Sequence, residues 1–211
     1  MAKNQHDHSG HHHAHGDEDR QGARQPERFD PARAALLDDP SRFGHLPPNE
    51  VFEMLAAPNG GRVVDFGTGT GTYAIELARG RPDLEVMALD EQQAMLDLLA
   101  AKPSAQKLSN LVLVHTDKIT KLNGTADRVL TINVLHELGD EALGALIALL
   151  KSNGTVLAVD WNADVERPVG PPRDHVYTPA EARERMERVG LQIESESMFK
   201  YHYALLARRA A

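Results

Sequence analysis

The feature that most constrains this chain is an apolar segment that ends in an acid and runs into three alternate glycines. Residues 62–71 read Arg-Val-Val-Asp-Phe-Gly-Thr-Gly-Thr-Gly. Glycine has no Cβ, so such a turn adopts positive φ and lets a ligand approach the backbone closely. Residues 72–79 then show a helical pattern that Gly80 and Pro82 end. This order directs free N–H groups and the positive helix end toward a ligand, and we expect a nucleoside-bearing cofactor there.

The glycine spacing differs from that of two familiar phosphate-binding turns. A dinucleotide fingerprint reads G-x-G-x-x-G, but here the third glycine is Gly71 and Thr72 stands at the fingerprint's position. The turn is not a P-loop either, because no Gly-Lys-Ser/Thr follows it. For this turn taken alone, a tight β–α connection without a ligand is the alternative.

Composition excludes several kinds of protein. At 211 residues the chain can form one well-buried domain with a small appendage. Its formal net charge of −8 argues against a nucleic-acid-binding surface, which needs stripes of Lys and Arg. The absence of Cys excludes disulfides, thiolate zinc sites and cysteine nucleophiles. No apolar run approaches the ~20 residues of a membrane span, and no signal core is present, so we expect a cytoplasmic protein.

The N-terminal part of the chain differs in composition from the rest. Residues 1–25 have almost nothing to bury and are expected to be a disordered, His-rich tail. Imidazole-rich tracts bind divalent metals, so the tail favours non-catalytic metal binding or buffering; a purification tag is the alternative. Six of the eleven histidines lie in this tail: His6, His8, His11, His12, His13 and His15.

Two further regions follow the tail. Residues 26–58 are expected to form an N-terminal helical cap, with helical patterns at 31–37 and 48–56. Residues 59–211 form the main domain, in which strand and helix patterns alternate. The strand runs are 63–66, 84–89, 111–115, 128–132 and 155–159, and the helical patterns are 91–100, 140–150 and 179–189.

The end of the chain carries two more strand patterns, 191–197 and 201–207, with only a few residues between them. So short a link permits an antiparallel hairpin but not a parallel crossover. The helix before them is marked by a capping box of Thr178 and Glu181 and by Gly190 after its end. Together these patterns predict an α/β fold: a Rossmann-like, seven-stranded, mostly parallel sheet with a C-terminal antiparallel hairpin and helices on both faces.

Three segments carry a resemblance to a known family. Residues 63–71 resemble the first motif of the class I S-adenosylmethionine-dependent methyltransferases, and the resemblance extends from about Arg62 to the C-terminus. Residues 133–138 (Asn-Val-Leu-His-Glu-Leu) and 154–161 (Gly-Thr-Val-Leu-Ala-Val-Asp-Trp) are similar to the small-molecule methyltransferases of ubiquinone and menaquinone biosynthesis. The resemblance implies transfer of a methyl group from S-adenosylmethionine to a small-molecule acceptor by in-line displacement.

The resemblance also implies a set of cofactor contacts. Asp90 would accept hydrogen bonds from the ribose hydroxyls, and Asp117 would bind the adenine amine beside Lys118. Two local alternatives stay open: Asp90 and Gln93 also fit a helix capping box, and Asp117 also fits a turn. The implied cofactor-binding residues are Asp65, Gly67, Thr68, Gly69, Gly71, Asp90, Glu91, Asp117, Lys118 and Asn133.

The catalytic candidates follow the fourth and fifth strands. By resemblance, Asp65 lies near the methionine amino group and Asn133 borders the transferring methyl. His136 is therefore the leading candidate for a group that binds the acceptor or removes its proton, although packing against the sheet end is an equal alternative. His175 is a second candidate base, because it lies in a Gly-Pro-Pro loop that could close over the pocket. From the cap, His45 could line the same pocket.

Two other function classes compete with methyl transfer. An NAD(P)-dependent oxidoreductase could use a similar sheet, but Thr72 and the terminal hairpin argue against it. A non-catalytic, metal-responsive protein would use the His-rich tail and keep the fold as a platform.

Overall fold

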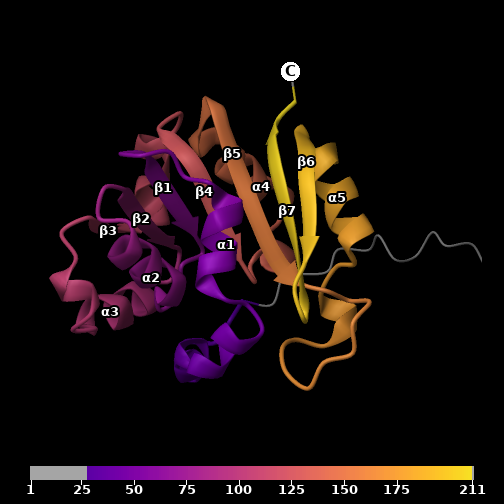
Figure 1. Ribbon diagram of the computed structural model, residues 1–211, viewed down its shortest axis with the longest axis horizontal. Helices are drawn as coiled ribbons and strands as arrows, with labels where there is room; N and C mark the ends of the chain where they lie inside the picture. The colour runs from indigo at the N-terminus through magenta and orange to yellow at the C-terminus, as the bar shows by residue number, and fades with distance from the viewer. Residues whose placement is uncertain (1–27, 211) are drawn as a thin grey trace, which may run out of the picture.

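One seven-stranded sheet organises the described part of the chain, residues 28–210, in the computed structural model of Figure 1. The strand order is β3-β2-β1-β4-β5-β7-β6, and neighbours from β3 to β5 pair in parallel. β7 runs antiparallel to both β5 and β6. The strands are β1 (Arg62–Phe66), β2 (Glu85–Asp90), β3 (Leu111–His115), β4 (Ala126–Ile132), β5 (Leu150–Trp161), β6 (Leu191–Met198) and β7 (His202–Arg209).

Helices connect these strands and precede β1. The α-helices are α1 (Pro48–Leu55), α2 (Thr72–Gly80), α3 (Gln93–Ala101), α4 (Asp140–Leu149) and α5 (Pro179–Arg188). The 3₁₀ helices are η2 (Pro31–Asp38), η3 (Pro40–Gly44), η4 (Ala105–Lys107), η5 (Thr116–Leu122), η6 (Leu135–Glu137) and η7 (Arg173–His175). η2 and η3, drawn in indigo, lie beyond the carboxyl ends of the strands in Figure 1.

The core consists of two apolar layers, one on each face of the sheet. Successive side chains of a strand point to opposite faces, so Val63 packs with α1 and α2 whereas Val64 packs with α4 and α5. Both valines are fully buried. This burial on two faces explains why the strands read as continuous apolar runs instead of alternating patterns.

The predicted fold class is confirmed, including the terminal hairpin. The predicted capping box is present, because Glu181 N donates to Thr178 Oγ1 at 3.1 Å and Thr178 N donates to Glu181 Oε2 at 2.8 Å. The other predicted box, between Asp90 and Gln93, is wrong. Asp90 Oδ1 instead accepts from Gln92 N at 2.9 Å, so α3 begins at Gln93, two residues later than expected.

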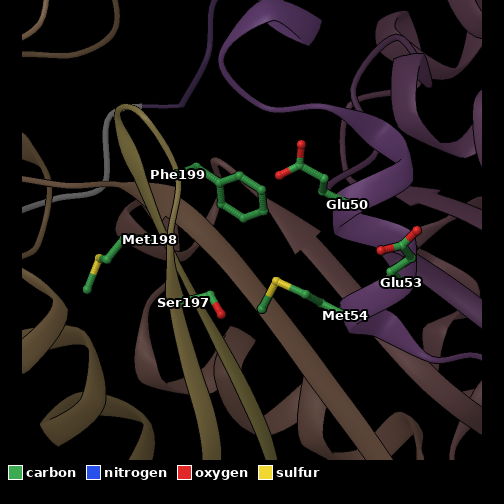
Figure 2. A pocket seen from close by; sticks show the side chains of 6 residues that line it. All are labelled: Glu50, Glu53, Met54, Ser197, Met198 and Phe199. Carbon is green, nitrogen blue, oxygen red and sulfur yellow. The ribbon is translucent and has the colours of Figure 1, made fainter.

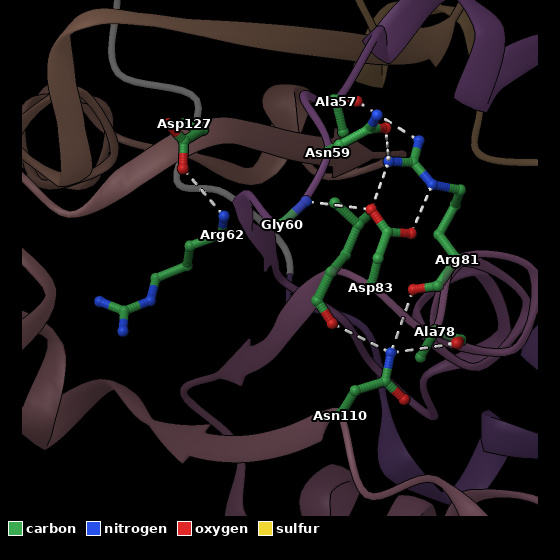
Figure 3. A network of polar contacts seen from close by, with 10 residues as sticks. Ala57, Asn59, Gly60, Arg62, Ala78, Arg81, Asp83, Asn110 and Asp127 are labelled. Atoms are coloured by element: carbon green, nitrogen blue, oxygen red, sulfur yellow. Dashed lines mark hydrogen bonds and ion pairs between the residues drawn. The ribbon is translucent and has the colours of Figure 1, made fainter.

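Polar side chains fasten the loops at the amino ends of the strands, opposite the carboxyl ends (Figure 3). The side-chain amide of Asn110 donates to the carbonyl oxygens of Ala78, Arg81 and Leu84 at 3.1, 3.2 and 3.0 Å. Arg81 also donates to both carboxylate oxygens of Asp83, each at 2.8 Å. One amide therefore ties the end of α2 to the start of β2.

Replacing Asn110 with Ala should lower the free energy of unfolding by about 1–3 kcal/mol, because three carbonyl groups lose their donor. Urea unfolding followed by circular dichroism measures this change. Asn153→Ala is the matched control, since Asn153 is exposed on β5. An equal loss in both variants would contradict a specific role for the Asn110 amide.

Candidate cofactor and active site

The glycine turn between β1 and α2 is fastened to the end of β2. Gly67 N and Thr68 N both donate to Leu89 O at 2.9 Å, and Gly69 N donates to Asp90 Oδ2 at 2.8 Å. The turn also lies where the strand order changes direction, since β1 pairs with β2 on one side and β4 on the other. Open α/β sheets bind ligands in the crevice at such a point.

Different neighbouring residues would crowd a side chain at each of the three glycines of the turn. All have positive φ: 74° at Gly67, 53° at Gly69 and 74° at Gly71. A Cβ on Gly67 would lie 2.7 Å from Val134, and a Cβ on Gly71 would lie 2.4 Å from Leu99. Close packing on α3 thus explains Gly71 without any ligand, while Gly67 lets the segment after β4 approach the turn.

An N-terminal segment, residues 28–38, crosses the glycine turn, and we call it the N-terminal strap. Leu37 Cδ1 lies 3.0 Å from a Cβ built on Gly69, so the Leu37 side chain fills the space above that glycine. Asp38 Oδ1 accepts from Thr70 Oγ1 at 2.6 Å and from Lys102 Nζ at 2.5 Å. These contacts hold the end of the strap over the predicted cofactor surface.

The beginning of the strap is attached to the turn after β2. Arg28 forms an ion pair with Glu91 at 2.5 Å, and Gln92 Nε2 donates to Phe29 O at 3.1 Å. The strap therefore runs from the predicted ribose side of the cleft to the glycine turn. Glu91, predicted to contact the cofactor, is paired with the strap.

Two buried carboxyl groups lie beside the turn. Asp65 is 3% exposed, and Thr68 Oγ1 donates to its Oδ2 at 2.7 Å. Burial raises the pKa of Asp65 to about 6, the Thr68 hydrogen bond opposes this rise, and the neighbouring Asp90 adds to it. Burial also raises the pKa of Asp90, although the N–H groups that it accepts oppose the rise. Both acids would gain from a ligand that brings hydrogen-bond donors or positive charge.

Asn133, at the end of β4, has two features typical of a ligand site. Its φ of 59° lies in the left-handed region, which a non-glycine residue rarely adopts, and such strain gathers at functional sites. Its N–H donates to Val159 O at 2.8 Å, but its buried Oδ1 has no partner among residues 28–210. A buried acceptor without a hydrogen bond is unfavourable, so a ligand that donates to Asn133 Oδ1 would be stabilised there.

His136 is held by Asp160, which lies near the end of β5. Nδ1 of His136 lies 2.8 Å from Asp160 Oδ1, and His136 N donates to Asp160 Oδ2 at 2.9 Å. The His136 side chain is 8% exposed and the Asp160 side chain is fully buried. The pair joins the segment after β4 to the end of β5.

Charges around His136 determine its protonation. Burial lowers its pKa, but the carboxyl groups of Asp160 and Glu137 together outweigh burial, so the pKa of His136 is raised above its ordinary value. Burial raises the pKa of the adjacent Glu137 to about 7, and His136 opposes that rise. His136 Nε2 lies 3.7 Å from Glu137 Oε1.

The remaining predicted residues lie further from this centre. Asp117 and Lys118 are on η5, after β3, and the Asp117 side chain is 62% exposed beside His115 Nδ1 at 3.1 Å. His175 is exposed on η7, in the loop between β5 and α5 that lies beyond the carboxyl ends of the strands in Figure 1. The predicted metal-binding histidines lie outside the described residues: His6, His8, His11, His12, His13 and His15.

Sequence reasoning missed Arg42, which reaches the site from η3. Arg42 Nη1 donates to Leu37 O at 2.6 Å, and its guanidinium lies 5.7 Å from the Tyr73 ring centroid. Its positive charge lowers the pKa of Asp65. No sequence motif links Arg42 to the glycine turn, so its proximity to Asp65 becomes evident only in the folded structure.

Aromatic rings gather at the carboxyl end of β5. His202 is fully buried, and its ring centroid lies 4.1 Å from Trp161 and 5.6 Å from the parallel ring of His45. Burial lowers the pKa of His202 to about 3, so this ring is neutral at physiological pH. His45, which was expected to line the acceptor pocket, packs beside Trp161, with 5.9 Å between the ring centroids.

A separate pocket of about 510 Å³ opens between α1 and the tip of the β6–β7 hairpin (Figure 2). None of the predicted cofactor-binding residues lines it, so it is distinct from the cleft at the glycine turn. Its lining residues are Glu50, Glu53, Met54, Ser197, Met198 and Phe199.

Within residues 28–210, no three His, Asp or Glu side chains are grouped so that they could hold a metal ion. No helix in the same range has the length and apolar character needed to cross a membrane.

Comparison with known proteins identifies the family. A methyltransferase domain family matches residues 45–196, well over half of the 211-residue chain. The chain belongs to this family. The predicted resemblance to S-adenosylmethionine-dependent methyltransferases is thereby confirmed, and family and fold together support S-adenosylmethionine as the cofactor. They do not favour an NAD(P)-dependent oxidoreductase.

A solved structure and two curated relatives illustrate the likeness. A SAM-dependent methyltransferase from Aquifex aeolicus matches with a TM-score of 0.79 and 28% identity, over 85% of this chain and 98% of that one. A trans-aconitate 2-methyltransferase from Deinococcus radiodurans is 39% identical over 49% of this chain and 38% of that protein. A demethylmenaquinone methyltransferase from the same organism is 46% identical over 23% of this chain and 20% of that protein. The chain spans less than half the length of the curated relatives it matches.

Replacing Asp38 with Ala removes the contacts that hold the strap to Thr70 and Lys102. Leu37 is then held above Gly69 less firmly, through its carbonyl oxygen alone, so the association rate constant for S-adenosylmethionine should increase. Stopped-flow fluorescence of Trp161, the only tryptophan of the chain, measures this rate. Asp97→Ala, at an exposed position of α3, serves as the control. An unchanged rate in the Asp38 variant would mean that the strap does not limit entry.

Proposed function

We propose that this chain binds S-adenosylmethionine at the glycine turn and transfers its methyl group to a small-molecule acceptor by in-line displacement. The observation that carries the proposal is the meeting of three strand ends: the turn after β1, Asp90 at the end of β2 and Asn133 after β4. Bound there, S-adenosylmethionine supplies a methyl group already activated by its sulfonium. The protein's main task is then positioning, which can contribute on the order of 7–11 kcal/mol to the barrier.

The cofactor's ends would meet residues of suitable chemistry. The carboxylate of Asp90 has lone pairs beyond those used by Gly69 N and Gln92 N, so it can accept the ribose hydroxyls. At the methionine end, Asp65 would take the ammonium group and Arg42 the carboxylate. The unpaired Oδ1 of Asn133 would accept a donor from the same end.

The acceptor would approach from the side of His136 and the loop that carries His175. These segments follow β4, which pairs with β1 beside the glycine turn, and β5, which pairs with β4 on its other side. A small-molecule acceptor is supported by two relatives that are named for trans-aconitate and demethylmenaquinone. The net charge of −8 argues against a nucleic-acid acceptor.

Asp90→Asn tests the cofactor site. The variant keeps an oxygen for Gly69 N but loses the charge that strengthens hydrogen bonds from the ribose, each worth roughly 1.5–3 kcal/mol. We expect the dissociation constant for S-adenosylmethionine, measured by calorimetry, to rise by about 10- to 100-fold.

Asp97→Asn on α3 is the matched control, because it makes the same chemical change at an exposed position. Equal affinities of the wild type, the Asp90 variant and the control would refute the proposed ribose contact. A wild type that does not bind S-adenosylmethionine would refute the function.

A further inference from the structure

The carboxylate of Asp160 is positioned to accept hydrogen bonds from the neighbouring His136. This carboxylate has no exposed surface and accepts from three groups: Trp161 N at 2.7 Å, His136 N at 2.9 Å, and His136 Nδ1. Nδ1 lies 2.8 Å from Oδ1 and 2.9 Å from Oδ2, so the ring faces both oxygens. No rotation of the imidazole would preserve these contacts.

This arrangement determines which ring nitrogen carries the proton. An ionised carboxylate only accepts hydrogen bonds, so Nδ1 of the neutral ring must be the donor. Nε2 then keeps its lone pair and points away from Asp160. Oε1 of Glu137 lies 3.7 Å from Nε2, which is too long for a hydrogen bond. The ring thus presents a free acceptor nitrogen at the carboxyl end of the sheet.

We propose that Asp160 is a positioning residue that fixes His136 as a general base, and that the methyl acceptor is therefore a protic one, such as a phenol or an enol. The inference rests on the proposed function, because it names the substrate class of that same site. A carboxylate acceptor is already ionised at neutral pH and needs no base, so the paired histidine distinguishes the two classes.

The charges that face His136 suit it to accept a proton. Asp160 on β5 and Glu137 on η6 favour the imidazolium, whereas burial and Arg167 of the following loop disfavour it. The carboxylates prevail, and the pKa of His136 lies above its ordinary value. A proton taken up at Nε2 therefore produces a cation that Asp160 already stabilises.

The transfer step is balanced with these groups. The acceptor oxygen forms a bond to the methyl carbon of S-adenosylmethionine, while the bond from that carbon to sulfur breaks and its electron pair stays on sulfur. The proton of the acceptor hydroxyl passes to His136 Nε2, and the imidazolium later releases it to solvent. The products are the methylated acceptor, S-adenosylhomocysteine and one proton.

The first test needs no acceptor. Two-bond ¹⁵N–¹H NMR spectra of imidazole-labelled protein report the tautomer and pKa of His136, and His136→Gln assigns its signal. We expect an Nδ1–H tautomer and a pKa above 6.5 in the wild type. Asp160→Asn should lower this pKa, whereas Asp164→Asn, an exposed acid four residues away, should leave it unchanged. An Nε2–H tautomer, or equal values in all three proteins, would overturn the proposal.

The second test uses a panel of phenols and 1,3-dicarbonyl enols with matched carboxylates, and it measures S-adenosylhomocysteine formation. Transfer should occur to a protic member, with kcat rising with pH through the pKa of His136. Asp160→Asn should lower kcat by about 10²-fold and move that rise to lower pH, with the affinity for S-adenosylmethionine unchanged. Asp160→Glu should restore part of kcat, and Asp164→Asn should match the wild type.

Other outcomes separate this inference from the proposed function. Transfer only to carboxylates, no transfer to any protic member, or a wild-type kcat and pH profile in Asp160→Asn would overturn the protic class and the role of Asp160. Loss of S-adenosylmethionine binding in the wild type would instead refute the proposed function, and the NMR result would still report whether Asp160 holds His136.

Discussion

The hydrogen bonds from the glycine turn to the end of β2 are the contacts on which the rest of the site depends. Gly67 N and Thr68 N share the carbonyl of Leu89, and Gly69 N takes one oxygen of Asp90. These bonds draw the turn toward β2 so closely that the opposite side of Gly67 meets Val134. Three strand ends can converge in this way only where the backbone lacks side chains, because a Cβ at Gly67 would lie 2.7 Å from Val134. The convergence of these strand ends is therefore a consequence of how the turn packs, and a ligand need not create it.

Much of this arrangement could be predicted from local patterns. Strands buried on both faces read as apolar runs, and a link of a few residues can only join antiparallel strands, so the sheet and its final hairpin followed from the sequence. Because parallel strands end at one edge, the acids and amide that follow them had to share that edge. Asp65, Asp90 and Asn133 are indeed brought there. The prediction failed where two local motifs shared one residue: Asp90 fitted a capping box, yet its oxygens bind Gly69 N and Gln92 N.

The strap and the neighbours of Asp65 and His136 could not be predicted, because their contacts join residues far apart in sequence. Asp38 reaches Lys102, 64 residues later, from a 3₁₀ helix that has a single buried residue. Arg42 acts on Asp65 through the fold alone. The bond of Asp160 to His136 depends on the register of β4 against β5, which no single strand pattern contains.

Asp65 and Asp160 show how one residue type meets two environments near the ends of β1 and β5, the strands on either side of β4. Asp65 has one hydroxyl donor, so burial prevails and its pKa rises to about 6. Asp160 is just as buried, and it accepts hydrogen bonds from two backbone N–H groups and an imidazole. An acid of the first kind gains most from an incoming cation, because burial outweighs the Thr68 hydrogen bond and the charge of Arg42. An acid of the second kind already accepts hydrogen bonds on both oxygens, and its role is to orient the side chain that donates to it. Asp65 lies near the end of β1 beside the glycine turn, and Asp160 lies near the end of β5 beside His136. Burial and donor number thus distinguish the acid proposed to bind the cofactor from the acid proposed to orient the base.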